Sequence, residues 1–213
     1  MHGAENIRFF SPEADTLVLK NRLPHWDQDG RVYSITFRLT DSVPGHLLRQ
    51  HRLAEVEWRK SHPEPWSAEV ESDYLKMFRG QIEKWLDQGH GECLLKQPAC
   101  TAVVAGALAH FEEQRTRLHA WVVMPNHVHA LVEILPGHYL PEVMESWKGF
   151  TAREINKLLS RSGAVWQKGY YDRLIRDWTH FGNVVRYIRR NPCKSRLSEG
   201  MFRSGESPLG ALF

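Results

Sequence analysis

The chain lacks the sequence features of disulfide-stabilised, secreted and membrane-spanning proteins. Its three cysteines are an odd count and include no Cys-x-x-Cys pair, which argues against a disulfide framework and a cysteine zinc site. No apolar run approaches the roughly 20 residues that a membrane-spanning helix needs, and the N-terminus lacks the basic-then-apolar order of a signal peptide. We therefore expect reduced cysteines and a cytoplasmic location.

The chain also has little net charge, +3 over 213 residues, but its basic residues are unevenly spread. Residues 142–203 hold thirteen Lys and Arg against six Asp and Glu, so the rest of the chain is net acidic. A basic segment with interleaved aromatic residues is typical of a surface that binds a phosphate backbone, although charge alone fits an ordinary solvated surface. The candidate phosphate contacts are Lys148, Arg153, Lys157, Lys168, Arg173 and Arg176.

The chain has no internal repeat and no low-complexity tract, so its fold follows from its periodic segments. Alternating and β-branched residues predict strands at 32–39, 118–124 and 127–135, and a strand-like segment at 165–176 that bends at Gly169. Apolar spacings of three and four predict helices at 47–60, 74–88, 99–113 and 142–160. Residues 1–31 are expected to be mostly loop.

A last helix is predicted after Asp177 or Thr179, either of which suits an N-cap, and Pro192 is expected to end it. The order of elements is strand, helices, two strands, helix, strand, helix. That order favours an α+β fold close to the ferredoxin-like βαββαβ arrangement, with an antiparallel sheet and helices packed on one face.

His127 and His129 are separated by a single valine on a predicted strand. Side chains alternate between the two faces of a strand, so both imidazoles should point to the same side. Two neighbouring ligands would then converge on one point, and the tight turn at residues 124–126 would place them at an accessible sheet end. The alternative is a surface or hydrogen-bonded core pair, since one such spacing among twelve histidines can arise by chance.

Tyr187 lies between the apolar stripe of the last helix and its arginine-rich face, and Asn191 follows one turn later on the same side. A phenol and an amide could therefore face the part of the sheet that bears the histidines. The alternatives are an amphipathic packing role for Tyr187 and a helix-ending role for Asn191 before proline.

These residue types suit phosphodiester chemistry. A divalent ion that polarises a non-bridging phosphate oxygen lowers the barrier to attack. Two imidazoles plus an amide oxygen leave coordination positions open for phosphate and water. A phenol with an ordinary pKa of about 10 reacts only with help from cationic charge, the metal or proton transfer. Its attack would give a phosphotyrosyl intermediate that preserves the bond energy for rejoining.

Three segments in order resemble the REP-associated tyrosine transposases, which are HUH-type single-tyrosine transposases. They are WVVMPNHVHALV at 121–132, VWQKGYYDRLIR at 165–176 and VRYIRRNP at 185–192. The segments LPHW at 23–26 and YSITFRLTDSVP at 33–44 are similar to the N-terminal part of one branch of that family. The resemblance covers residues 23–197. We therefore expect a transposase domain at 23–200, preceded by an extension at 1–22 and followed by a tail at 201–213.

The resemblance implies that His127 and His129 form the HUH metal site, that Tyr187 is the nucleophile and that Asn191 is a third ligand to Mg²⁺ or Mn²⁺. It implies an endonuclease and strand-transferase that cleaves and rejoins single-stranded DNA with palindromic, hairpin-forming repeats. The products would be a 5′-phosphotyrosine and a free 3′-OH. It further implies a bacterial protein associated with the nucleoid, for which a monomer is favoured over a dimer.

Other interpretations stay open from the residues alone. Tyr170 and Tyr171 are rival nucleophiles, ranked below Tyr187 because they lie on a predicted strand. A histidine-triad hydrolase would need a third histidine where the chain has Leu131. A domesticated, non-catalytic DNA-binding module of the same fold is the main functional alternative, and a plain interaction protein is the third.

Overall fold

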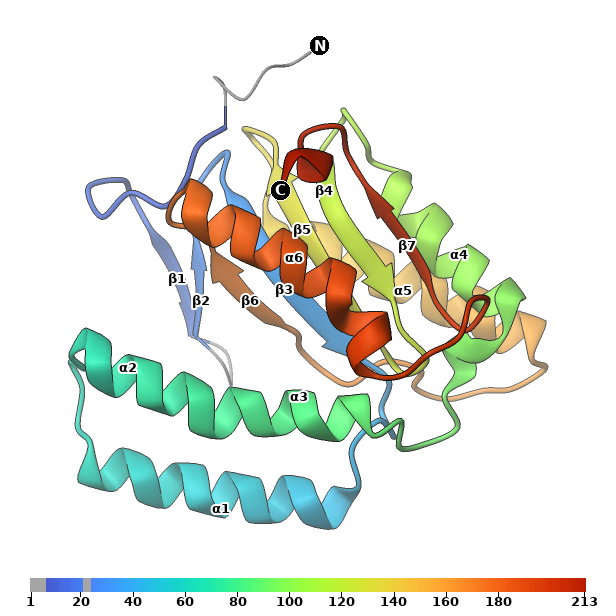
Figure 1. Cartoon of the computed structure of the whole chain (residues 1–213), viewed down its shortest axis with the longest axis horizontal. Helices are drawn as coiled ribbons and strands as arrows, with labels where there is room; N and C mark the ends of the chain where they lie inside the picture. Colours follow the sequence, from blue (N-terminus) through green and yellow to red (C-terminus); the bar gives the residue numbers. More distant parts are fainter. Residues whose placement is uncertain (1–6, 21–23) are drawn as a thin grey trace.

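The computed structural model describes residues 7–20 and 24–213, so Leu23 and part of the predicted N-terminal extension lie outside the described residues. Its centre is a five-stranded antiparallel sheet in the order β6-β3-β5-β4-β7, and β1 and β2 form a separate two-stranded sheet (Figure 1). The strands are β1 (Leu17–Lys20), β2 (Pro24–Asp27), β3 (Val32–Arg38), β4 (Thr116–Val123), β5 (His127–Ile134), β6 (Tyr171–Leu174) and β7 (Arg203–Glu206).

Two groups of helices surround the sheet. One group forms a helical hairpin, residues 45–87, which lies below the sheet in Figure 1 and runs out along α1 and back through α2 and α3. Its parts are α1 (Gly45–Ser61), α2 (Ala68–Tyr74), the π-helical turn η2 (Leu75–Arg79) and α3 (Gly80–Asp87). The remaining helices are η3 (Leu94–Lys96), α4 (Pro98–Ala109), α5 (Leu140–Leu158), α6 (Trp178–Lys194) and η4 (Gly210–Leu212). Among the described residues, no helix is both long enough and apolar enough to span a membrane.

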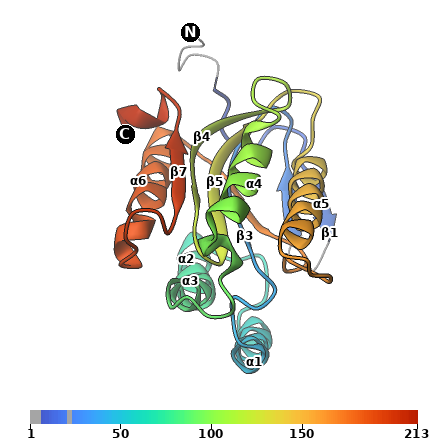
Figure 2. The same ribbon diagram turned by 90° about the vertical axis from the view of Figure 1, so that its right-hand side faces the viewer.

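The predicted α+β fold with an antiparallel, ferredoxin-like sheet is confirmed, and its helices cover both faces of the sheet. Figure 2 shows α4 and α5 on one face and α6 on the other. Val128, Ala130 and Val132 of β5 point into the core under α4 and α5. Leu131 points into a second core, which contains Phe181 and Val185 of α6. The expectation of helices on one face holds for α4 and α5 and is wrong for α6. The apolar stripe of α6 is buried against the opposite face of the sheet.

The helix α6 begins where the sequence indicates and ends later than expected. The Asp177 side chain accepts a hydrogen bond from the His180 amide at 2.7 Å, which makes it the N-cap. The helix then continues through Pro192 to Lys194. Proline removes one backbone donor and crowds the carbonyl of residue i−4, yet the helix continues here, and the Ser195 and Leu197 amides donate to the carbonyls of Asn191 and Pro192.

The strand-like segment at 165–176 is only partly a strand. Trp166 forms an isolated bridge with Leu39, Gly169 then takes a φ of +80°, and regular pairing with β3 occupies only Tyr171–Leu174. The bend at Gly169 is thus confirmed, because a positive φ breaks the ladder at a residue that has no Cβ. The expectation of loop over residues 1–31 is wrong where β1 and β2 pair.

The C-terminal residues, expected to be a tail, are part of the sheet and brace α6. Strand β7 pairs with β4, and Arg189 of α6 forms an ion pair with Glu206 at 2.8 Å. The ring of Phe213 stacks on Trp178 with centroids 5.9 Å apart and also contacts Phe181. Residues 203–213 therefore hold the last helix against the sheet.

Replacing Gly210 by alanine is expected to lower the free energy of unfolding by about 1–3 kcal/mol. Gly210 is buried, and a Cβ there would collide with the backbone carbonyl oxygen of His119, which cannot rotate away. Gly106→Ala in α4 is the matched control, because a Cβ at Gly106 meets no atom within 4 Å. It should be neutral or stabilise by up to about 1 kcal/mol. Urea denaturation measures both, and equal stabilities would contradict the close packing of the C-terminal turn.

Candidate active site

The two histidines lie side by side on the face of the sheet that α6 covers. His127 and His129 are 1% and 3% exposed, and their Nε2 atoms are 3.0 Å apart. The predicted turn precedes them, closed by a hydrogen bond from the Met124 amide to the His127 carbonyl at 2.8 Å. The spacing of two on a strand therefore brings both rings to one point, as the sequence predicts.

Asn126 fixes the protonation of His127. Its Nδ2 donates to the carbonyl oxygens of Leu86 at 3.2 Å and of His90 at 3.3 Å, so its Oδ1 faces Nδ1 of His127 at 2.7 Å. An amide oxygen only accepts, so Nδ1 of His127 carries the ring proton. The lone pair of His127 is therefore on Nε2, the atom that faces His129.

Thr36 of β3 holds the second imidazole from the neighbouring strand. Thr36 and His129 are register partners, and Oγ1 lies 2.8 Å from Nδ1 of His129. If the Thr36 hydroxyl donates to Nδ1 of His129, the proton of His129 is on Nε2 and is donated to Nε2 of His127. If instead Nδ1 of His129 carries the proton and donates to the hydroxyl, the Nε2 lone pairs of both histidines face the same point. Arg79 also donates to this hydroxyl, from Nη2 at 3.3 Å. Both Nδ1 atoms are therefore occupied by protein partners, and both Nε2 atoms face inward.

Both imidazoles are neutral at physiological pH. Burial, assisted by the positive charge of Lys194, lowers the pKa of His127 to about 3. Burial also lowers the pKa of His129, with His127, Arg79 and Lys194 adding to the effect. Neutral imidazole is the form that ligates metal ions.

Tyr187 reaches this pair from α6. Its hydroxyl lies 3.4 Å from Nε2 of His129, and the two rings meet edge to face with centroids 5.2 Å apart. Burial raises the pKa of Tyr187, and the nearby carboxylate of Glu83 raises it further. Asn191 and Arg79 act in the opposite direction. The phenol is therefore protonated in this state, with one cationic and one amide group beside it.

Asn191 lies one turn after Tyr187 and is 1% exposed. It is close enough to the phenol to lower its pKa, yet within the described part of the chain neither amide atom has a partner in full hydrogen-bond geometry. A buried amide without partners costs about 1–3 kcal/mol. Such a side chain is expected where a ligand supplies the missing partner.

The donor set fits an octahedral divalent ion. Two ligands each about 2.1 Å from such an ion, and at a right angle, are about 3.0 Å apart, which matches the separation of the two Nε2 atoms. The unpartnered amide of Asn191 supplies a third donor. No group of three His, Cys, Asp or Glu side chains converges anywhere in the described ranges. A metal here would therefore depend on two imidazoles and one amide, which leaves positions open.

The sequence analysis did not predict four of the residues that form this site. Thr36 and Asn126 hold the imidazoles, while Arg79 and Glu83 come from the helical hairpin and form an ion pair at 3.2 Å. The hairpin is some forty residues away from the histidines in sequence. Only the packing of the hairpin below the sheet brings its charges to Tyr187.

The rival tyrosines lie on opposite faces of the sheet. The pairing of β3 with β5 and β6 sets Tyr171, Thr36 and His129 in one row, so Tyr171 shares the face of the histidines. Its ring is covered by the guanidinium of Arg79, 3.0 Å from the ring centroid. Tyr170 packs against the core on the other face. Tyr187 contacts a histidine of the pair directly, through its hydroxyl.

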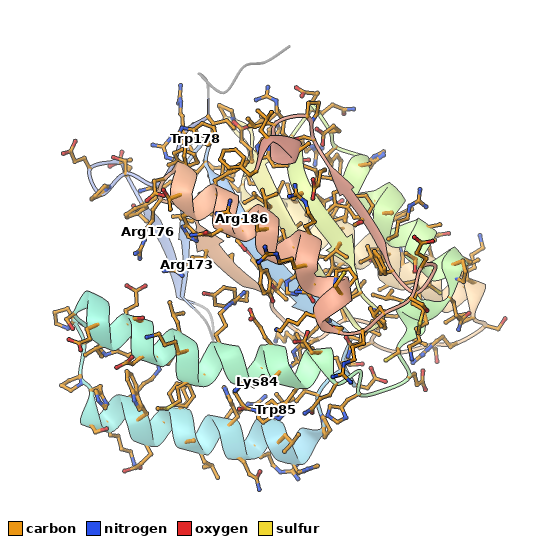
Figure 3. All side chains as sticks on the ribbon, in the orientation of Figure 1. Lys84, Trp85, Arg173, Arg176, Trp178 and Arg186 are labelled. Carbon is orange, nitrogen blue, oxygen red and sulfur yellow. The ribbon has the colours of Figure 1, made fainter. Side chains whose placement is uncertain are left out.

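The basic residues predicted as phosphate contacts fall into two groups. Lys148, Arg153 and Lys157 lie on α5, on the opposite face from Tyr187, and Lys148 donates to the carbonyl oxygens of Gln167 and Gly169. Figure 3 shows Arg173 and Arg176 beside β6 and Arg186 on α6. Lys168 lines a pocket next to the histidines. Arg173 shares the face of the sheet that bears Thr36 and Tyr171, and Arg176 forms an ion pair with Glu71 of α2 at 3.3 Å. The structure leaves the α5 residues away from the site.

Comparisons with known proteins show which proteins this chain is similar to. Residues 100–191, which hold both histidines, Tyr187 and Asn191, match the family model described as "Transposase IS200 like". An uncharacterised protein of Haemophilus influenzae is 29% identical over 37% of this chain, which spans 55% of that relative's length. A solved REP-associated tyrosine transposase bound to a REP hairpin has a TM-score of 0.42 and 15% identity, over 80% of this chain and 71% of that one. The predicted resemblance to transposases is confirmed over residues 100–191, where this chain is similar to the IS200-like transposases.

Proposed function

We propose that this protein is a metal-dependent endonuclease and strand-transferase that cleaves and rejoins single-stranded, hairpin-forming repeat DNA in the bacterial cytoplasm. One observation carries the proposal. The Tyr187 hydroxyl lies 3.4 Å from Nε2 of His129, which itself lies 3.0 Å from Nε2 of His127. A nucleophile and two converging neutral ligands are the parts that phosphoryl transfer to a tyrosine needs.

The residues divide the chemistry between them. His127, His129 and Asn191 would hold Mg²⁺ or Mn²⁺, which when bound polarises a non-bridging oxygen of the scissile phosphate. The Tyr187 oxygen forms a bond to phosphorus while the bond from phosphorus to the 3′-oxygen breaks. The phenolic proton ends on that 3′-oxygen, which gives a 5′-phosphotyrosine and a free 3′-OH. Arg79, which lowers the pKa of Tyr187, stabilises the negative charge that develops on the phenol oxygen.

The site is complete within one chain, which favours a monomer. Tyr187 contacts His129 of its own sheet, and the ion pair of Arg189 with Glu206 ties α6 to strand β7 of the same chain. A second copy would not have to supply the nucleophile. The basic side chains Lys168, Arg173 and Arg176 would bind the DNA backbone.

The test is adduct formation on labelled single-stranded oligonucleotides that carry palindromic repeats of the source genome. We expect a denaturant-resistant protein–DNA adduct with Mn²⁺ or Mg²⁺, and none with a chelator. Peptide mapping of the adduct should place the DNA on α6, within residues 178–194. Tight binding without an adduct under any ion would favour the alternative, a domesticated DNA-binding module of the same fold.

A further inference from the structure

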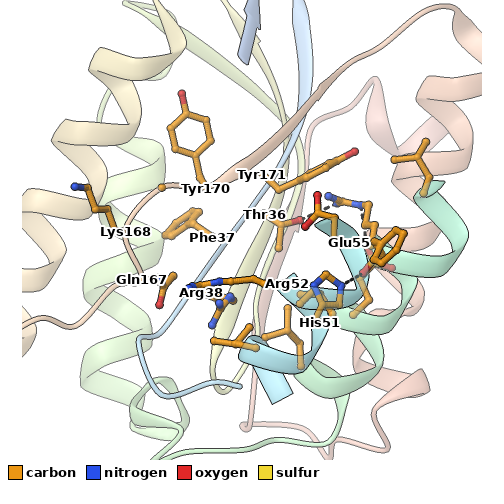
Figure 4. Close-up of a pocket in the computed structure, with 18 of the residues that line it drawn as sticks. Thr36, Phe37, Arg38, His51, Arg52, Glu55, Gln167, Lys168, Tyr170 and Tyr171 are labelled. Carbon is orange, nitrogen blue, oxygen red and sulfur yellow. Dashed lines mark hydrogen bonds and ion pairs between the residues drawn. The ribbon is translucent and has the colours of Figure 1, made fainter. Parts of the chain in front are cut away.

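A pocket of about 280 Å³ opens between the helical hairpin, strand β3 and the segment that leads into β6. Figure 4 shows Arg38 and Arg52 near one another in it and Tyr171 above them, while Lys168 lies at the left edge with its amine directed outward. Leu48, Leu75 and Ile82 of the hairpin give it an apolar wall. Its volume is near the lower end of ligand pockets, roughly 300–1,000 Å³, so it suits one ring system rather than a base pair.

The pocket adjoins the candidate active site and shares residues with it. Thr36, Arg79 and Glu83 line the pocket. Thr36 also contacts Nδ1 of His129 at 2.8 Å, and both Arg79 and Glu83 act on the phenol of Tyr187. A group bound in the pocket would therefore lie next to the phosphate that Tyr187 attacks.

The lining combines a stacking surface with positive charge. The guanidinium of Arg79 lies 3.0 Å from the centroid of the Tyr171 ring, so a flat cation and a flat ring are already stacked. Unpaired bases stack on both aromatic rings and guanidinium planes. Arg52 and Lys168 add positive charge suited to a phosphate. Two hairpin carboxylates line the pocket, and both are already paired: Glu55 with Arg59 and Tyr74, and Glu83 with Arg79.

The backbone of the hairpin is irregular where it meets this pocket. Residues 75–79 form a π-helical turn between α2 and α3, and three of its five residues, Leu75, Phe78 and Arg79, line the pocket. Such turns are rare and are frequent at functional sites, because the extra residue redirects side chains. Here the turn directs Arg79 toward Thr36 and Tyr171.

We propose that this pocket binds one unpaired base of the DNA strand that flanks the phosphate attacked by Tyr187. The base would stack against the Arg79 and Tyr171 surface, and Arg52 and Lys168 would contact its phosphate. This proposal rests on the proposed function, since it specifies how the same site recognises its substrate. It gives the helical hairpin, which lies outside the matched residues 100–191, a direct role in choosing the cleavage position.

The test combines a protein variant that blocks the pocket with DNA probes that each lack one base. Leu48→Trp places a bulky side chain in the pocket wall, and Leu53→Trp on the same helix is the control, because Leu53 is 72% exposed and does not line the pocket. The probe is a single-stranded oligonucleotide that carries one palindromic repeat of the source genome. In a set of such probes, each unpaired flanking nucleotide is in turn made abasic. Binding is measured without metal, so that no cleavage occurs.

We expect one abasic position to weaken binding by about tenfold, the effect of losing one stacked base. Leu48→Trp should weaken binding of the intact probe to a similar extent and be insensitive to the abasic site, while Leu53→Trp should match the wild type. The pocket proposal would be overturned if the losses of affinity from Leu48→Trp and from the abasic site multiplied. It would also be overturned if no abasic position weakened binding of a DNA that the enzyme still cleaves when metal is added. Either result would leave the proposed function intact. Failure of the wild type to bind the probes at all would overturn both.

Discussion

Replacing Tyr187 by phenylalanine is expected to abolish the covalent protein–DNA adduct. The substitution removes one oxygen, the atom that would bond to phosphorus, and keeps the ring that packs edge to face on His129. The contact of the phenol with His129 is long, 3.4 Å, so the fold should lose little when the hydroxyl is removed. Adduct yield should therefore fall below detection, while the melting temperature and the affinity for hairpin-forming DNA stay close to those of the wild type.

The controls for this variant are the two tyrosines of the β6 segment. Tyr170→Phe and Tyr171→Phe should both retain the adduct, because Tyr170 packs into the core on the opposite face and Tyr171 lies under Arg79. Denaturing gel electrophoresis with labelled DNA measures all three variants. An adduct that persists in Tyr187→Phe and disappears in Tyr171→Phe would reassign the nucleophile.

Replacing His127 by alanine is expected to lower the rate of adduct formation by about a thousandfold. On the proposed mechanism His127 is a metal ligand, and its loss would remove most of the stabilisation that the metal gives the transition state, several kcal/mol, with each 1.36 kcal/mol worth tenfold in rate. His127 is the proposed ligand whose orientation is best determined, since Asn126 fixes its Nδ1 and leaves Nε2 facing inward. We expect Mn²⁺ to raise the melting temperature of the wild type, because a bound ion stabilises the folded state, and His127→Ala should abolish that rise.

His110→Ala is the matched control for this experiment. His110 is exposed at the end of α4 and has no contact with the histidine pair, so its loss should change neither the adduct nor the response to Mn²⁺. Thermal unfolding with and without Mn²⁺ distinguishes metal binding from a catalytic defect. A His127→Ala protein that keeps both the metal response and the adduct would remove the imidazole pair from the mechanism.

The local features of the site followed from the sequence because they depend on short-range geometry. The spacing of two between His127 and His129 determines that both rings share a face of any strand. The spacing of four between Tyr187 and Asn191 likewise places them together on any helix. The Asp177 N-cap and the bend at Gly169 are also local, and the structure confirms both.

What only the tertiary structure decided are the contacts between segments that are distant in the chain. No local pattern predicts that the helical hairpin packs below the sheet and delivers Arg79 and Glu83 to Tyr187, since that depends on which surfaces bury one another. The same holds for the seating of α6 on the second face of the sheet and for strand β7, a short polar segment that becomes a strand by pairing with β4. The sequence by itself determined which residues could act and which of them share a strand or a helix. The packing of α6 and the hairpin determined that they meet at one place, because such long-range burial depends on the whole chain.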